Sequence, residues 1–189
     1  MKTTIRLTAC VLLFVFMSCA LLSCGAKVVD GVTVPAGMRM IVSESKDYNL
    51  IVPDNWLTDT TVGMTSAYCE DAARSSVSVT ANELSGLETT TIEDYWNGFS
   101  EQFLAAFPDF EMVDKEPSDV TVGAANEGSE TKGLKYRYTA TVGDTKYQWM
   151  QVLFIRNATI YIMTYTSTAE AYDSHLDDVN NIIAHFSFR

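Results

Sequence analysis

Few residues of this chain carry side chains that could perform chemistry, and most of them are isolated in the sequence. Cys69 could act as a nucleophile only with a base, and the chain has two histidines, His175 and His185. His175 lies near Asp177 and Asp178, so these three side chains could contact one cation from a helix. Polar residues at this spacing more often form a solvated helix face. We therefore predict a buried, inert thiol at Cys69 and no metal site.

Sequence motifs of established enzyme chemistry are absent. The chain has no Gly-rich phosphate loop, Gly-x-Ser-x-Gly elbow, His-Glu-x-x-His pair, Cys-x-x-Cys pair or calcium-binding loop. The carboxylates Glu127 and Glu130 fall in a polar stretch that predicts an exposed loop. We therefore expect no enzymatic activity and no cofactor.

Cys24 has a different kind of chemistry available. It closes the run Leu21-Leu22-Ser23-Cys24, which follows a start containing Lys2 and Arg6 and an apolar stretch over residues 7–22. A basic region, an apolar region and a small residue at the cut are typical of a secretory signal peptide. The apolar stretch of about 16 residues is shorter than the roughly 20 that a membrane-spanning helix needs. We therefore predict a cleaved signal rather than a transmembrane anchor.

The end of this segment resembles the lipobox of bacterial lipoproteins. The resemblance implies cleavage before Cys24 and acylation of its thiol, so the mature chain would be held on the membrane by lipid. A cut before Cys19 is an alternative, but it places Phe16 and Met17 where Leu21 and Leu22 fit better. We predict a signal peptide over 1–23, a lipidated cysteine and tether over 24–37 and one domain over 38–189.

The predicted location follows from this resemblance. The protein is expected outside the cytoplasm, anchored by lipid to the bacterial cell membrane. Gly25 rather than Asp follows Cys24, which in a Gram-negative cell would permit export to the outer membrane.

Loss of the signal peptide changes the charge and the cysteine count. The full chain has a net charge of −11, and losing the two basic residues Lys2 and Arg6 gives −13. Such an acidic surface repels nucleic acid and anionic headgroups, so neither is an expected partner. With Cys24 acylated, Cys69 is the one free cysteine of the mature chain and cannot form an intramolecular disulfide.

The first half of the domain shows strand-like alternation followed by a helical pattern. Residues 48–52, 62–68 and 77–81 alternate as strands do, and a capping box of Thr90 and Glu93 predicts the start of a helix that Pro108 ends. The apolar stripe of this helix is rich in aromatic residues and could line a ligand site. Packing against a sheet is the expected use of such a stripe.

The second half predicts an antiparallel meander and a final helix. A short strand at 120–122 precedes strands at 135–142, 145–155 and 158–165, joined by tight turns at Gly143-Asp144 and Arg156-Asn157. A second capping box, Ser167 with Glu170, predicts the start of the last helix, and residues 186–189 form an extended tail. The fold class is α+β: an antiparallel sheet flanked by helices on both faces.

Two segments are similar to PsbP-like domains, the group that includes the PsbP and DcrB proteins. They are the strand Tyr48-Asn49-Leu50-Ile51-Val52-Pro53-Asp54-Asn55-Trp56 and the strand, turn and helix from Tyr161 to Phe188. The resemblance implies an α/β/α sandwich and a non-enzymatic accessory or binding role. It carries no site residue onto this chain, and Trp56 is expected to be a core plug.

Two functions are compatible with these patterns. The first is a lipid-anchored module outside the cytoplasm that docks a protein partner at the cell envelope. The alternative is a surface lipoprotein that binds a small molecule or a metal in a cleft between sheet and helix, with Tyr136, Tyr138 or Trp149 contributing.

Overall fold

The computed structural model describes residues 25–42, 46–59, 64–84 and 90–189. Its strands and helices are β1 (Lys27–Val29), β2 (Val32–Val34), β3 (Met38–Val42), β4 (Tyr48–Pro53), β5 (Leu57–Asp59), β6 (Met64–Tyr68), β7 (Ser76–Glu83), α2 (Ile92–Ala106), β8 (Glu111–Met112), β9 (Ser118–Val122), β10 (Thr131–Val142), β11 (Thr145–Arg156), β12 (Thr159–Thr168), the 3₁₀ helix η1 (Tyr172–His175), α3 (Leu176–His185) and β13 (Ser187–Phe188). Cys24 and the expected signal peptide lie outside the described residues.

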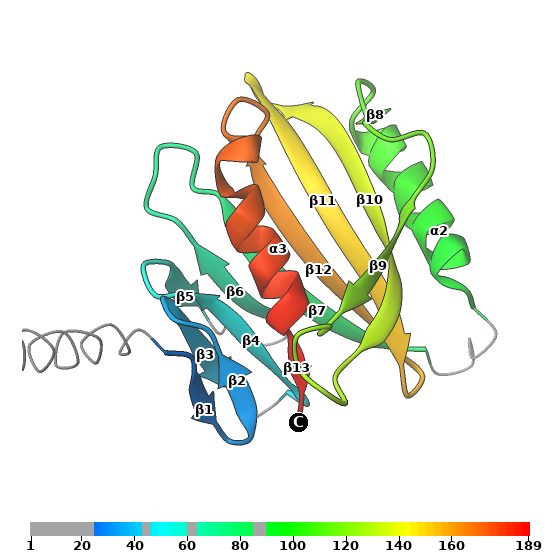
Figure 1. Ribbon diagram of the computed structural model, residues 1–189. Helices are drawn as coiled ribbons and strands as arrows, with labels where there is room; N and C mark the ends of the chain where they lie inside the picture. The colour runs from blue at the N-terminus through cyan, green and yellow to red at the C-terminus, as the bar shows by residue number, and fades with distance from the viewer. Residues whose placement is uncertain (1–24, 43–45, 60–63, 85–89) are drawn as a thin grey trace, which may run out of the picture.

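An antiparallel sheet forms the body of the domain (Figure 1). Within the described residues it has eight strands in the order β5-β6-β7-β12-β11-β10-β8, with β9 paired to the other end of β10. The hairpins β10–β11 and β11–β12 supply its centre. At the second of these turns, Asn157 and Ala158 have φ angles of 51° and 56°, as a two-residue hairpin turn requires. The predicted meander is confirmed.

One face of this sheet carries the larger core. Helix α3 buries Val179, Ile182 and Ile183 there, against a cluster that includes Phe154 of β11. A three-stranded sheet, β13-β4-β3, covers the neighbouring part of the same cluster. All six residues of β4 are buried, so this strand is covered on both of its sides.

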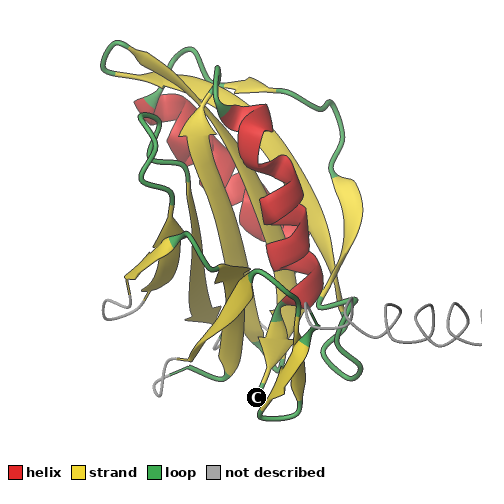
Figure 2. Cartoon of the chain, turned by 60° about the vertical axis from the view of Figure 1, so that its left-hand side comes forward, coloured by secondary structure: helices red, strands yellow, loops and turns green. Residues whose placement is uncertain are grey.

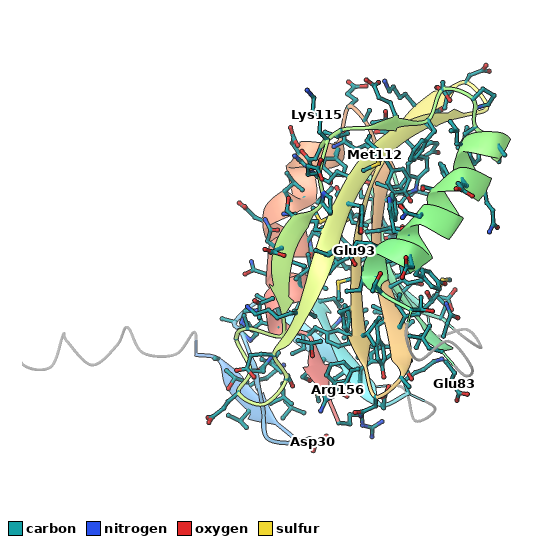
Figure 3. All side chains as sticks on the ribbon, turned by 90° about the vertical axis from the view of Figure 1, so that its right-hand side faces the viewer. Asp30, Glu83, Glu93, Met112, Lys115 and Arg156 are labelled. Carbon is teal, nitrogen blue, oxygen red and sulfur yellow. The ribbon has the colours of Figure 1, made fainter. Side chains whose placement is uncertain are left out.

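The opposite face carries a smaller core beneath α2. Leu153 follows the alternation of β11 and points away from Phe154, into a cluster with Trp96 of α2. Figure 2 shows the two helices and the strands between them, and Figure 3 shows side chains filling the space between α2 and the sheet. Trp96 is the buried residue of α2, and the rest of the helix is partly or fully exposed. The antiparallel sheet is therefore confirmed, whereas the expected sandwich with helices on both faces is met only in part.

The two helix starts differ from those that the sequence predicted. The N-cap of α2 is Thr91, whose Oγ1 accepts from the Asp94 backbone, so the capping box lies one residue after the predicted Thr90–Glu93 pair. Ser167 caps no helix. It is fully buried near the end of β12, where its Oγ lies 2.8 Å from Ser75 Oγ. Pairing with β11 extends β12 to Thr168 and removes this residue from the helix.

Helix α3 ends against the loop that follows β9. The backbone N–H of Gly123 donates to Ile183 O at 2.9 Å, and Asn126 Nδ2 donates to His185 O at 2.8 Å. These contacts satisfy carbonyls that a helix terminus would otherwise leave unpaired. The chain then continues into β13, so the predicted extended tail is confirmed.

The segment predicted as a tether contains the β1–β2 hairpin. Val34 of β2 is fully buried in the larger core, and Val32 packs against it. Two residues, Gly25 and Ala26, separate Cys24 from the first residue of β1.

Candidate functional site

Three side chains with ligating or nucleophilic atoms meet beside the larger core. Cys69 directly follows β6, Asp71 lies in the turn between β6 and β7, and His175 ends η1. Their ligand atoms all lie within 4.8 Å of one another. The three residues come from two segments far apart in the sequence, so the fold is what brings them together.

The turn between β6 and β7 places Cys69 and Asp71. Cys69 N donates to Ser75 O at 2.8 Å, which closes the hairpin. Asp71 Oδ1 accepts from Ser75 N at 3.3 Å, and its carbonyl accepts from Arg74 N at 3.1 Å. An aspartate whose side chain bonds the backbone of its own turn is a common means of fixing a tight turn. The Asp71 carboxylate is therefore held beside Cys69 by the local backbone.

The His175 ring makes different contacts through its two nitrogens. Nε2 lies 2.8 Å from Asp71 Oδ2, while Nδ1 lies 3.8 Å from Cys69 Sγ and 3.9 Å from Asp178 Oδ2. A carboxylate accepts a proton rather than donating one, so Nε2 carries the hydrogen and the Nδ1 lone pair faces Cys69 in the neutral ring. The buried Trp56 ring packs at 88° to the imidazole, with centroids 5.9 Å apart.

Charges around the cluster act on both acidic groups. Burial alone would raise the pKa of Asp71, but hydrogen bonds from His175 and from the Ser75 and Arg74 backbone lower it overall. Burial raises the pKa of the Cys69 thiol to about 12, and the negative charges of Asp71 and Asp178 add to this effect. The free thiol is therefore protonated at neutral pH.

This electrostatic setting opposes nucleophilic catalysis. The side-chain contacts run from Cys69 to His175 and from His175 to Asp71. Cysteine hydrolases use the same succession of contacts, in which a base activates the thiol. Reactive cysteines, however, have a lowered pKa from cationic neighbours or a helix N-terminus, because the thiolate is the nucleophile. At Cys69 the pKa is moved the other way, by burial and by two carboxylates. The geometry resembles a triad, whereas the charges do not.

Sequence reasoning located these residues only in part. Cys69 is buried, as predicted. The prediction that His175 belongs to a solvated helix face is wrong, because its side chain is 21% exposed and turns toward Cys69 and Trp56. Asp177 is exposed, and His185 is partly exposed with Nδ1 2.9 Å from Asn181 O. The one sequence feature that points to this site is the presence of a lone cysteine and a histidine that could act together. The sequence does not show how far apart the two side chains lie.

A cavity of about 530 Å³ lies on the Asp71 side of this cluster. Its lining comes from the β6–β7 turn and from the segment that leads into η1, including Asp71, Ala72, Glu170 and Ser174. The cavity gives solvent access to the Asp71 carboxylate, whose side chain is 33% exposed.

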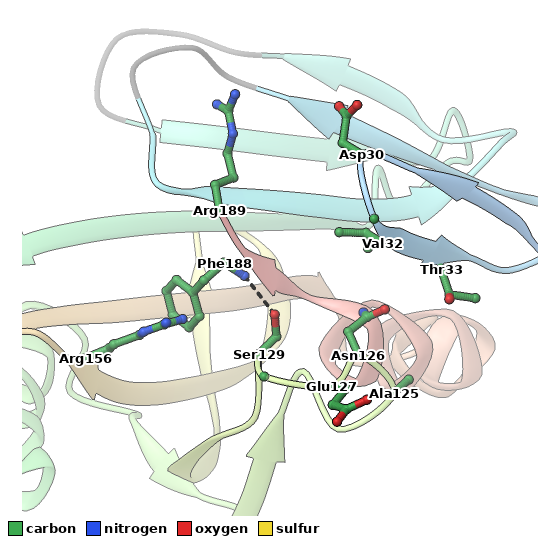
Figure 4. A pocket seen from close by; sticks show the side chains of 12 residues that line it. Asp30, Val32, Thr33, Ala125, Asn126, Glu127, Ser129, Arg156, Phe188 and Arg189 are labelled. Carbon is green, nitrogen blue, oxygen red and sulfur yellow. Dashed lines mark hydrogen bonds between the residues drawn. The ribbon is translucent and has the colours of Figure 1, made fainter.

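A second cavity of about 690 Å³ lies between the β1–β2 turn and the loop after β9 (Figure 4). Arg156 and Phe188 form part of its lining, and the guanidinium carbon lies 3.9 Å from the Phe188 ring centroid. Asp30 and Glu127 bring negative charge to the same cavity. Its charges are therefore mixed and select no class of ligand.

The aromatic residues near α2 form packing rather than a ligand site. Tyr136 and Tyr138 are 3% and 1% exposed, and Trp96 stacks on Tyr136 with ring centroids 4.0 Å apart. Phe103 packs edge-on against Trp149. The prediction that the aromatic stripe packs against the sheet is confirmed. These rings fill the space between sheet and helix, where the alternative function expects a ligand-binding cleft.

Comparison with known families decides the membership of the chain. The model of the DcrB family matches residues 49–185, which include the sheet, both helices and the Cys69–His175 cluster. The chain belongs to the DcrB family. The resemblance to PsbP and DcrB domains that the sequence suggested is thereby confirmed. No match was found among curated protein sequences.

Solved structures support the fold of this DcrB-family chain. The PsbP protein of the cyanobacterium Synechocystis is 16% identical, with a TM-score of 0.55, covering 89% of this chain and 99% of that one. A Ran-binding protein of Saccharomyces cerevisiae is 8% identical, with a TM-score of 0.55, covering 80% and 95%. A Pseudomonas aeruginosa protein of unknown function, described as a putative regulator, is 18% identical, with a TM-score of 0.50, covering 78% and 94%. At these identities the likeness concerns the fold.

No helix in the described part of the chain is both long enough and apolar enough to cross a bilayer.

Proposed function

We propose that this DcrB-family protein is a lipid-anchored, non-catalytic accessory module that docks a protein partner at the cell envelope. The observation that carries the proposal is the family match over residues 49–185 in a chain whose preceding segment ends in Leu21-Leu22-Ser23-Cys24. The family match supports the accessory role of the folded domain, and the lipobox-like run supports its attachment to the membrane by lipid. The electrostatics at Cys69 favour a non-catalytic role as well, because they hold the thiol protonated.

We assign the docking surface to the part of the sheet that α2 leaves open. Ala67 of β6, Val77 of β7 and Met163 of β12 belong to the larger core. Their neighbours in the alternation point to the other face. Ser66, Ser78 and Thr164 form one row across the three strands there, and Tyr68, Ser76 and Thr166 form the next. All six are partly exposed.

The chemistry of this open face suits a protein partner. Hydroxyl groups provide hydrogen bonds in both directions. Tyr68 adds an aromatic surface, over which the Arg74 guanidinium lies at 5.4 Å from the ring centroid. The exposed side chain of Leu57 stands opposite Tyr68 in the register of β5 and β6, which extends the face with an apolar group. Protein interfaces of the non-obligate kind combine polar and apolar surface in this way.

Lipid attachment is tested by labelling cells that express the full chain with an alkyne fatty acid. We expect label on the wild type and on C69S, and none on C24S. Wild-type levels of label on C24S would overturn the lipid assignment.

Docking is tested by photocrosslinking in intact cells. A photoreactive amino acid at Ser78 or Thr164 is expected to capture a discrete protein adduct. The same group at Asn180, an exposed position on α3, serves as the matched control and should give none. Adducts from Asn180 but not from Ser78 or Thr164 would refute the assigned surface, and the absence of adducts at all three positions would refute docking.

A further inference from the structure

Sulfur and oxygen donors flank the His175 ring, which packs against Trp56. His175 Nδ1 lies 3.8 Å from Cys69 Sγ and 3.9 Å from Asp178 Oδ2. Cys69 comes from the end of β6, whereas His175 and Asp178 come from η1 and the first turn of α3. Thiolate, imidazole and carboxylate are the three ligand types that Zn²⁺ takes in proteins.

These separations can be compared with those of a bound ion. Zinc–nitrogen and zinc–sulfur bonds of about 2.0 and 2.3 Å at a tetrahedral angle place the two ligand atoms about 3.5 Å apart. A nitrogen and an oxygen ligand at similar bond lengths lie about 3.3 Å apart. The observed 3.8 and 3.9 Å exceed these values by a few tenths of an ångström, which small side-chain rotations can close.

We propose that Cys69 Sγ, His175 Nδ1 and Asp178 Oδ2 bind a divalent transition-metal ion of the Zn²⁺ class. His175 Nδ1 lies within 4 Å of each of the other two donors, and the three atoms combine soft and hard ligands. Sulfur and nitrogen ligands favour Zn²⁺ over Mg²⁺ and Ca²⁺, which take oxygen ligands.

Asp71 has a separate role in this site, as a positioning residue. Its Oδ2 lies 2.8 Å from His175 Nε2, the nitrogen that does not face Cys69. Histidines that bind a metal usually donate their other N–H to a carboxylate, which fixes the ring and leaves the ligating nitrogen deprotonated. The turn hydrogen bond from Ser75 N holds Asp71 in place for this purpose.

The surrounding charge favours a cation. The Asp71 carboxylate lies within 4.8 Å of Cys69 Sγ, and the Asp178 carboxylate lies 3.9 Å from His175 Nδ1. On binding, the thiol loses its proton to the solvent and the sulfur forms a bond to the ion, so the dication replaces a proton next to two carboxylates. The negative charge of the two carboxylates therefore attracts the dication to this site.

The site is accessible and leaves one coordination position for another group. The Asp178 and His175 side chains are 42% and 21% exposed, which provides a route for the ion. Three protein ligands leave a fourth position for water or for a group from a partner. Trp56 borders the cluster, and its Nε1–H is buried with no hydrogen-bond partner among the described residues.

Metal binding is tested on the full-length protein in detergent. Isothermal titration with Zn²⁺ should give one site per chain, and saturating Zn²⁺ should raise the melting temperature by about 5 °C or more, since the ion binds the folded state. Titration with Co²⁺ should produce a sulfur-to-metal charge-transfer absorption in the near ultraviolet. This absorption reports directly on a thiolate ligand.

Substitutions separate the roles of the four residues. C69S should remove the charge-transfer absorption, and D178N should weaken Zn²⁺ binding by at least about tenfold. D71N should keep the absorption and weaken binding by roughly 10- to 100-fold, as loss of a partner to a ligating histidine does. D177N is the matched control for D178N, because it removes the neighbouring carboxylate from the same helix turn and should change affinity less than twofold.

Three results would overturn the assignment. They are the absence of a Zn²⁺ site on the wild-type chain, a charge-transfer absorption that survives in C69S, and equal affinities of D178N and D177N. Because Asp177 and Asp178 both lie in the first turn of α3, their substitutions have similar effects on folding, and the comparison stays valid if C69S proves unstable.

Discussion

The Trp96 indole lies parallel to the Tyr136 ring, with an interplanar angle of 15° and centroids 4.0 Å apart. This stack joins α2 to β10 at the centre of the smaller core, and Phe99 packs beside it on the same helix. Trp96 is the buried side chain of α2. The attachment of the helix to the sheet therefore depends on one residue more than on any other.

Replacing Trp96 with alanine is expected to destabilise the domain by about 3–5 kcal/mol, because it removes a large buried ring and leaves a cavity. Urea unfolding followed by far-UV circular dichroism measures the loss. Leu104 is 51% exposed on the same helix, and L104A should change the free energy of unfolding by no more than about 0.5 kcal/mol. Equal effects of the two substitutions would contradict the packing described for α2.

The start of α2 distinguishes two neighbouring threonines. Thr91 Oγ1 accepts from Asp94 N at 3.1 Å, and the Asp94 side chain accepts from Thr91 N at 3.1 Å. T91A should therefore cost about 1 kcal/mol in the free energy of unfolding. T90A, which alters the neighbouring residue outside this box, should cost a small fraction of that. A larger effect at Thr90 would restore the Thr90–Glu93 box that the sequence predicted.

The ion pair between Asp114 and Arg137 predicts a dependence of stability on pH. Two guanidinium nitrogens of Arg137, Nε and Nη2, each donate to the Asp114 carboxylate at 2.6 Å. This contact lowers the pKa of Asp114. The stabilisation is therefore complete above the unfolded-state pKa of about 3.9 and is lost as pH falls through the lower folded-state value. Because the pair is partly exposed, D114N should cost about 1 kcal/mol at pH 7.

The pH dependence can be checked by measuring unfolding free energies from pH 7 to pH 2. The difference between D114N and wild type should shrink toward the acid end. D119N, which removes an exposed carboxylate from β9, provides the control and should change the free energy of unfolding at pH 7 by no more than about 0.5 kcal/mol. A D114N difference that grows on acidification would refute the assigned sign.

Gly123 and Gly128 offer a matched pair for testing the loop that ends α3. Both have positive φ, at 73° and 80°. A Cβ on Gly123 would lie 2.5 Å from Ser129 O and 2.8 Å from Phe186 O, whereas a Cβ on Gly128 meets nothing within 4 Å. Both alanine variants pay about 1–2 kcal/mol for the left-handed conformation. G123A should cost more than G128A in thermal unfolding, because backbone atoms must also move.

Much of this fold is readable from the sequence because local rules determine it. Strict alternation and tight turns identify β10, β11 and β12, and Pro53 and Pro108 stop β4 and α2 close to where they were expected. The error at Ser167 has a physical cause. Cross-strand pairing with β11 extends β12 through a residue whose local pattern suits an N-cap, so tertiary structure overrides a capping preference.

The candidate site was not readable in the same way. His175 Nδ1 and Cys69 Sγ meet across 106 residues, and no local pattern encodes that distance. The spacing of His175, Asp177 and Asp178 suggested three ligands from one helix, but His175 ends η1 and turns inward while Asp177 points outward. A ligand set made from one residue of a hairpin, one of η1 and one of α3 becomes visible only once the register of β6 and β7 is known.

The β1–β2 hairpin limits how far the domain could stand from a bilayer. With Val34 packed in the core, the free chain after Cys24 consists of Gly25 and Ala26, which span at most about 7 Å when extended. An acylated Cys24 would therefore keep the domain against the lipid headgroups with restricted rotation. It could not sweep through the surrounding space, so its reach for a partner would be limited to the immediate neighbourhood of the membrane surface.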